Sequence, residues 1–226
     1  MSSTTHKYSR IIKEAASRHG FMGAGIARAE HMDEEAARLE QWLCEGHHGE
    51  MAYMANHFDM RVDPTKLVPG AKSVISLVYN YYPGEREAKA EAKAKEGLLL
   101  TTHNSQLTKT SSDAAKQPEE ENFKISRYAY GEDYHKVVRR KLKALVNELK
   151  KEIGDFNARV FVDSAPVLER DWAKRSGQGW IGKNTLLIHP KKGSYFFLAE
   201  IILDVELEYD HPMRDHCGTC TRCIDA

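Results

Sequence analysis

The sequence has no segment long and apolar enough to suggest export or a membrane span. Its first seven residues contain no apolar stretch of the kind that signal peptides carry. No apolar run approaches the roughly 20 residues that cross a bilayer. The longest runs, around 74–78 and 195–203, have the length of strands. We therefore expect a cytoplasmic protein without a membrane association.

The chain also lacks net charge, since 33 Lys and Arg residues balance 33 Asp and Glu residues. Such a molecule has no general attraction for nucleic acid, so RNA would need a local basic patch. Our candidate patch comprises Arg170, Lys174, Arg175 and Lys183. A second basic group comprises Lys136, Arg139, Arg140 and Lys143. It lies on the polar face of a predicted helix and is either a solvated face or a phosphate-binding surface.

Cysteine is scarce outside the last ten residues. Cys44 stands alone in a helix-like segment, which suggests a small buried apolar residue. Cys217, Cys220 and Cys223 form a C-x2-C-x2-C motif. In a chain without an export signal, this spacing suggests metal or cluster ligands rather than disulfides. A zinc site or a tail of free thiols is the alternative.

The cysteine motif matches the opening of the bacterial ferredoxin motif, whose fourth cysteine follows three residues after the third. Here residues 224–226 fill the three spacer positions and the sequence ends. We therefore expect a chain truncated within its first cluster motif. We also expect that the three thiols do not complete a 4Fe–4S cluster.

The apolar pattern predicts an α+β, layered fold in which helices flank a central mixed or antiparallel sheet. Strands are expected at 21–27, 73–82, 125–130, 158–162, 185–189 and 195–203, and helices at 7–19, 33–46, 133–154 and 166–177. The turn at 190–193 predicts a hairpin between the last two strands. Residues 84–122 contain few core residues, which predicts a polar insertion within the domain.

Asp163 is the first candidate for chemistry, because it stands at the end of an apolar strand. Desolvation there would raise the pKa of its carboxyl and allow proton donation near neutral pH. The alternative is structural, with Asp163 or Ser164 capping a helix that begins at Pro166. The residues alone favour the cap.

Two turns are candidate ligand sites. The first, 127–135, gathers aromatic, acidic and imidazole side chains where a strand meets a helix. The second, 177–184, has three glycines in six residues, which allow a close backbone approach to a ligand. The alternatives are an ordinary capped helix with aromatic packing for the first turn and a plain tight connection for the second.

Four motifs together resemble the epoxyqueuosine reductase family. They are Val162–Arg170 (VDSAPVLER), Arg127–His135 (RYAYGEDYH), Gly179–Leu187 (GWIGKNTLL) and His216–Cys223 (HCGTCTRC). They occur in the family's order. The resemblance runs from about Tyr8 to the end of the sequence, outside 84–122.

The resemblance implies a nitroreductase-like, cobalamin-binding catalytic domain at 1–210, with the start of a ferredoxin-like domain at 211–226. It implies that the enzyme reduces epoxyqueuosine to queuosine in the tRNA anticodon loop. Cobalamin and two 4Fe–4S clusters in the full-length protein would supply the reducing power, and Asp163 the proton. An external electron donor and a monomeric state are expected.

The resemblance also assigns site residues. The expected metal ligands are Cys217, Cys220 and Cys223. The expected cofactor-binding residues are Arg61, Tyr130, Asp133, Tyr134, His135, Asp163, Arg170, Ile181, Lys183 and Asn184. Two other functions stay open: a corrinoid-dependent reductase acting on another oxidised or halogenated substrate, and a non-catalytic corrinoid-binding or electron-transfer module. Asp163 favours an enzyme, because an electron carrier needs no proton donor.

Overall fold

The computed structural model describes residues 3–82, 126–129 and 131–225. The chain divides into two compact units, one formed by 1–80 with 132–226 and the other by 81–131. The predicted insertion at 84–122 and Tyr130 lie outside the described residues. In the second unit, Arg127–Ala129 form a short 3-10 helix, η2, so the strand predicted at 125–130 is wrong there.

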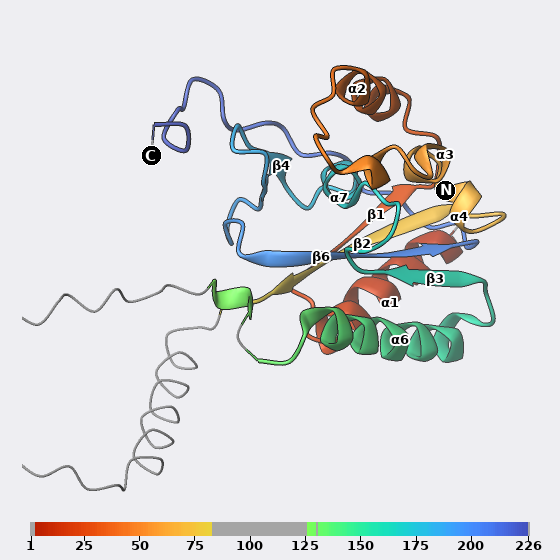
Figure 1. The fold of residues 1–226 in the computed structure, drawn as a ribbon. Helices are drawn as coiled ribbons and strands as arrows, with labels where there is room; N and C mark the ends of the chain where they lie inside the picture. The colour runs from red at the N-terminus through yellow and green to blue at the C-terminus, as the bar shows by residue number, and fades with distance from the viewer. Residues whose placement is uncertain (1–2, 83–125, 130, 226) are drawn as a thin grey trace, which may run out of the picture. The chain divides into compact units, whose positions relative to one another are not determined.

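A four-stranded antiparallel sheet organises the first unit, as the sequence predicted (Figure 1). The strands are β1 (Gly23–Arg28), β2 (Ser73–Asn80), β3 (Ala158–Phe161) and β6 (Phe196–Leu203). Their order is β1-β2-β6-β3. β2 and β6 are central and almost continuously apolar, because both of their faces are covered.

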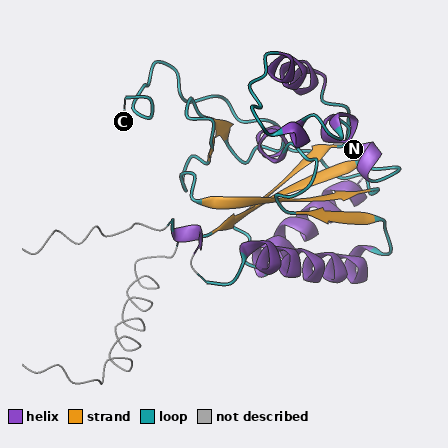
Figure 2. Ribbon diagram, in the orientation of Figure 1, coloured by secondary structure: helices purple, strands orange, loops and turns teal. Residues whose placement is uncertain are grey.

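Two long helices cover one face of this sheet, α1 (Ser3–Arg18) and α6 (Tyr134–Ile153) (Figure 2). α6 buries Val138, Leu142, Leu145 and Leu149, whose spacing of three and four residues places them on one face. Its N-cap is Asp133, whose carboxylate accepts a hydrogen bond from the His135 amide.

Shorter helices cover the other face of the sheet. These are α2 (Asp33–Cys44), α3 (Phe58–Val62), α4 (Pro64–Leu67) and α7 (Glu169–Arg175), with a 3-10 turn, η1, at Ala52–Met54. Trp172 of α7 is almost fully buried against the sheet beside Val74 and Ile202. Cys44, expected to be buried, is exposed at the end of α2.

The predicted hairpin between 185–189 and 195–203 does not form. β5 (Leu187–Ile188) pairs instead with β4 (Trp180–Ile181), while β6 pairs with β2 and β3. Only a single bridge, His189 to Gly193, remains at the predicted turn. β6 pairs elsewhere because its apolar faces are buried between the two helix layers. No helix among the described residues is long and apolar enough to cross a membrane.

Candidate active site

Asp163 lies two residues after the end of β3 and has a left-handed backbone conformation, with φ of 55°. Its amide donates a hydrogen bond of 2.6 Å to Oε1 of Glu169. Helix α7 begins only at Glu169, and its N-cap, Leu168, makes no side-chain cap bond. The capping role considered for Asp163 or Ser164 is therefore wrong, because residues 163–168 form an irregular loop before the helix.

The Asp163 carboxylate is held by two residues from the start of α6. The Tyr134 hydroxyl donates to Oδ2 at 2.6 Å, and Nε2 of His135 lies 3.0 Å from the same oxygen. Nδ1 of His135 is 2.8 Å from Oδ1 of Asp133. The side chain of Asp163 is 58% exposed, so the desolvated carboxyl expected at the strand end is wrong.

Both partners of Asp163 have raised pKa values. The hydrogen bond to Asp133 raises the pKa of His135, and Asp163 adds to the effect. Burial, together with the bond to Asp163, raises the pKa of Tyr134 and keeps its phenol protonated. The Tyr134 ring also stacks on Phe197 with centroids 3.9 Å apart, which fixes its direction.

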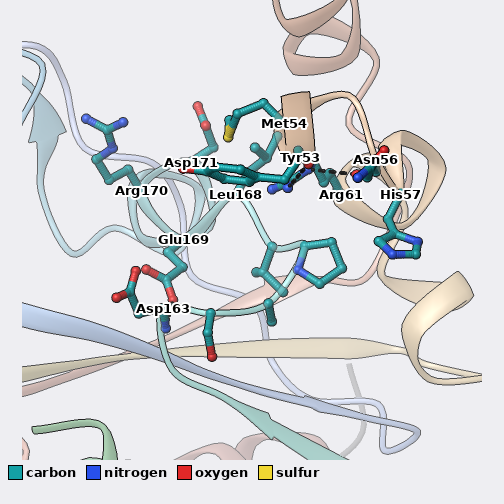
Figure 3. Close-up of a pocket in the computed structure, with 14 residues that line it drawn as sticks. Tyr53, Met54, Asn56, His57, Arg61, Asp163, Leu168, Glu169, Arg170 and Asp171 are labelled. Carbon is teal, nitrogen blue, oxygen red and sulfur yellow. Dashed lines mark hydrogen bonds between the residues drawn. The ribbon is translucent and has the colours of Figure 1, made fainter. Parts of the chain in front are cut away.

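A cavity of about 710 Å³ opens beside Asp163 (Figure 3). Arg61 from α3 and Arg170 from α7 both line it, so the structure brings these two predicted residues together with Asp163. Arg61 donates to the backbone carbonyls of Tyr53 and Asn56, which orders the loop forming one wall. Arg170 donates to the carbonyl of Thr185. The cavity thus combines two cations, the three carboxyls of Asp163, Glu169 and Asp171, and apolar groups such as Leu168.

Two carboxyls near Asp163, the partly buried Glu169 and the buried Glu200, were not predicted from the sequence. Burial raises the pKa of Glu169 to about 7, against the hydrogen bond from the Asp163 amide, which lowers it. The charge of Asp163 adds to the rise, and the charges of Arg170 and His135 oppose it. Glu200, on β6, is fully buried, and its carboxyl oxygens have no hydrogen-bond partner among the described residues. Burial and the neighbouring Glu169 raise the pKa of Glu200 well above its ordinary value. A single charge within the apolar run FFLAEIIL was the signal for Glu200.

The glycine-rich turn positions its predicted residues away from this cavity. Ile181 lies in β4, and Asn184 accepts a hydrogen bond from the Leu186 amide within the β4–β5 turn. Nζ of Lys183 donates to the carbonyls of Gly218 and Cys220, at 2.9 and 3.1 Å. None of the three lines the Asp163 cavity. The bond from Arg170 to Thr185 is what joins this turn to the cavity wall.

The cysteine segment lies against the same turn. The Trp180 indole donates to Sγ of Cys217 at 3.3 Å, and the Trp180 ring is 4.9 Å from that of His216. All three cysteines are free thiols, and no described group of three or more His, Cys, Asp or Glu residues is arranged to hold a metal ion. The three thiols could provide three of the four thiolate ligands of a 4Fe–4S cluster. A hydrogen bond from an N–H group to a ligand sulfur, such as the one from Trp180, helps to set the reduction potential of such a cluster.

The basic patch expected at residues 170–183 is largely committed to internal contacts. Arg175 forms ion pairs with Glu35 and Glu30, at 2.7 and 3.3 Å. Arg170 and Lys183 are bound to backbone carbonyls. Lys174 alone of the four has no such contact within the described residues. This surface is therefore not the set of free cations that the sequence suggested.

Comparison with known proteins gives a consistent set of relatives. Residues 61–164 match the family model described as "Epoxyqueuosine reductase QueG, DUF1730". Epoxyqueuosine reductase of Cyclobacterium marinum is 51% identical over 225 residues, which is 99% of this chain and 63% of that protein. The Pseudomonas aeruginosa enzyme is 41% identical over 97% of this chain and 54% of its own length. The chain thus spans less than two thirds of these relatives.

Solved structures agree. An epoxyqueuosine reductase bound to an epoxyqueuosine-modified stem loop of tRNA-Tyr superposes with a TM-score of 0.76 and 29% identity, over 97% of this chain and 51% of that one. The Bacillus subtilis enzyme has been solved with an aspartate-bearing catalytic loop swung out of its active site. It superposes with a TM-score of 0.73 and is 28% identical, over 97% of this chain and 51% of that one. A B12-dependent reductive dehalogenase, 12% identical over 96% of this chain and 22% of its own, shares the fold with a TM-score of 0.51.

Proposed function

This chain belongs to the epoxyqueuosine reductase family, and we propose that it carries the cobalamin-binding catalytic domain of such an enzyme at 1–210. Its reaction would be the reduction of epoxyqueuosine to queuosine in the tRNA anticodon loop. Residues 211–226 would begin the ferredoxin-like domain. The proposal includes a cytoplasmic location, a monomeric state and an external electron donor.

One observation carries this proposal: Asp163, whose carboxylate is held by Tyr134 and His135, lines a cavity of the size that small molecules occupy. At about 710 Å³, the cavity lies within the range of roughly 300–1,000 Å³ typical of small-molecule sites. Both hydrogen bonds to Asp163 end on Oδ2, so Oδ1 has no such bond from the described residues. Oδ1 is therefore the atom that we assign to the substrate.

The protein's own part in the reaction is the transfer of a proton. Reduction of an epoxide to an alkene takes two electrons and two protons and releases water. As the C–O bond breaks, Asp163 gives a proton to the leaving oxygen, which would otherwise depart as an alkoxide. Tyr134 and His135 then hold the remaining carboxylate at Oδ2, over 2.6 and 3.0 Å. Oδ1 takes its next proton from solvent, to which the Asp163 side chain is exposed. Such a positioned acid typically contributes about 10²–10⁴-fold.

Cobalamin would supply the electrons to carbon, and 4Fe–4S clusters would pass electrons to it. For the corrinoid, the fitting residues are those of the Asp163 cavity, with Arg61 and Arg170 on its walls and Tyr134 and His135 behind the carboxylate. Tyr130, Ile181, Lys183 and Asn184 stay as predicted contacts. For a cluster, Cys217, Cys220 and Cys223 provide three ligands.

The proposal is tested in two steps. The absorption spectrum of cobalamin is first recorded with and without the protein at micromolar concentrations. We expect the absorption bands of cobalamin to shift when the protein is added. Unchanged bands would contradict the proposal that this chain binds a corrinoid. An epoxyqueuosine-containing stem loop is then added in single turnover, with titanium(III) citrate as the electron donor. Mass spectrometry should show the loss of one oxygen atom from the nucleoside. Corrinoid binding without this loss would instead support a non-catalytic corrinoid module.

A further inference from the structure

We propose that a basic cleft along the outer side of β3 binds a backbone phosphate of the RNA substrate. The cleft has a volume of about 630 Å³. Its cationic residues are Arg139 and Lys143 from α6 and Arg159 from β3, and His57 also lines it. β3 is the edge strand of the sheet, and α6 runs alongside it, as Figure 1 shows. The inference rests on the proposed function, because it takes tRNA to be the substrate.

The charge of the cleft is uncompensated. No acidic residue lines it. Arg139 and Lys143 are one helical turn apart on the same face of α6, and neither has an ion-pair partner in the part of the chain that the structure describes. The next residue on the helix differs: Arg140 forms an ion pair with Glu132 at 3.1 Å. The cations of the cleft are therefore available for an anionic ligand, whereas their neighbour is not.

Arg159 is held in place before any ligand binds. Its Nη1 donates to the carbonyl of Leu67 at 2.8 Å, and its guanidinium lies 5.2 Å from the ring centroid of Phe161. That hydrogen bond uses one of the five N–H donors of the group. A fixed guanidinium with free donors suits the fork geometry by which arginine binds phosphate oxygens.

The position of the cleft connects it with catalysis. His57, Ser164, Ala165 and Pro166 line both the basic cleft and the Asp163 cavity, so the segment after Asp163 separates the two. A nucleotide whose base enters the Asp163 cavity has its own and its neighbour's phosphates close to that segment. Because the molecule has no net charge, RNA needs a local cationic surface. Apart from Lys174, the patch at residues 170–183 is committed to internal bonds.

The test compares a double variant, Arg139→Gln with Lys143→Gln, against a control with the same loss of charge, Lys7→Gln with Lys151→Gln. Both control residues are exposed and lie outside the cleft. Binding of a tRNA-Tyr anticodon stem loop is measured at several salt concentrations. At low salt, we expect the cleft variant to bind on the order of tenfold more weakly and the control to bind like wild type. The log–log salt slope should fall by about 0.7 for each phosphate that the variant no longer neutralises.

A cobalamin titration of the same proteins separates the possible phosphate sources. We expect unchanged cobalamin binding in the cleft variant. Weaker cobalamin binding with wild-type RNA affinity would assign the cleft to the phosphate of the corrinoid and overturn the proposal. Equal RNA binding and salt slope in all three proteins would also overturn it, but would leave the proposed function standing. If the wild-type chain bound cobalamin but no RNA, both the cleft and the tRNA substrate would be ruled out.

Discussion

At the scale of single residues, Asp163 is a strained residue with well-defined partners. Its φ of 55° lies in the left-handed region, where most side chains are unfavourable and Asp and Asn are tolerated best. Glu169 holds its amide and Tyr134 and His135 hold its carboxylate. A strained residue fixed on both its backbone and its side chain is a common feature of functional sites.

This geometry makes Asp163→Asn the best test of the proton donor. Asn tolerates the same backbone conformation but supplies no acidic proton, so single-turnover reduction should fall about 10²–10⁴-fold while cobalamin binding is retained. Asp163→Ala is the weaker variant, because alanine in this conformation adds a folding cost of about 1–2 kcal/mol. A folded Asp163→Asn protein with near-normal turnover would leave Asp163 only a structural role.

Tyr134→Phe tests the hydrogen bond to Asp163 separately. The raised pKa of Tyr134 makes the phenol a donor of a hydrogen bond rather than a source of protons. Its loss should therefore slow turnover by about tenfold, the equivalent of roughly 1–1.5 kcal/mol, and far less than Asp163→Asn. Phe keeps the stack on Phe197, so stability should change little. A loss as large as that of Asp163→Asn would show that the phenol itself transfers the proton.

Single residues also show where sequence reasoning stopped. Asp163 was identified as a candidate, but its contacts with Tyr134 and His135 join residues almost thirty positions apart, which spacing cannot indicate. Glu200 carried a local signal as a lone charge in a strand. Burial of Cys44 was wrong because a helix end has no covering element there.

At the scale of elements, the close contact between β1 and the segment after α7 depends on glycine. A Cβ added at Gly25 would lie 2.2 Å from the backbone oxygen of Ser176. A Cβ at Gly23 would lie 2.3 Å from Oε1 of Gln178, the far end of a flexible side chain. The two glycines are on the same face of β1, two residues apart. They therefore differ in what must move when a methyl group is introduced.

Gly25→Ala should consequently destabilise the protein more than Gly23→Ala. Overpacking against backbone typically costs about 1–3 kcal/mol, whereas the Gln178 side chain can rotate away. Urea unfolding of the two variants measures the difference directly. Equal midpoints would mean that the Ser176 backbone moves as easily as the glutamine side chain.

The sequence predicted well those elements whose type and limits depend on their own residues rather than on distant partners. β2 and β6 are apolar runs of strand length, and α6 has both its apolar spacing and its Asp133 cap. The hairpin at 190–193 failed because the partner of a strand is chosen by burial across the whole sheet. The start of α7 was misplaced because Pro166 suits an extended loop as well as a first helical turn.

At the scale of the whole molecule, the partly buried Glu169 and the buried Glu200 should control how stability depends on pH. Folding raises the pKa of Glu169 from an ordinary 4.5 to about 7, and raises that of Glu200 as well. The folded state therefore binds protons that the unfolded state releases between these pH values. The free energy of unfolding should fall as pH rises from about 4.5 to about 7.

Replacing Glu169 or Glu200 by glutamine should make the free energy of unfolding depend less on pH. A shift of one pKa unit corresponds to about 1.4 kcal/mol, so Glu169 alone should lower the free energy of unfolding by at most about 3 kcal/mol between pH 5 and pH 8. We expect Glu169→Gln and Glu200→Gln to raise the free energy of unfolding more at pH 8 than at pH 5. The exposed control Glu34→Gln should keep the wild-type profile. Chemical denaturation at the two pH values makes the comparison; parallel profiles for all proteins would contradict the assignment.

The pairing of β2 with β6 has a consequence for how the protein is made. The two strands share the longest ladder in the sheet, yet β6 is synthesised more than a hundred residues after β2. β1 precedes β2 and can pair with one of its edges early. The other edge has no strand to pair with until residue 203 has left the ribosome. During that interval an apolar strand has an open edge, which is the feature that favours aggregation and chaperone binding. Slow synthesis after residue 80 should therefore lower the yield of folded protein.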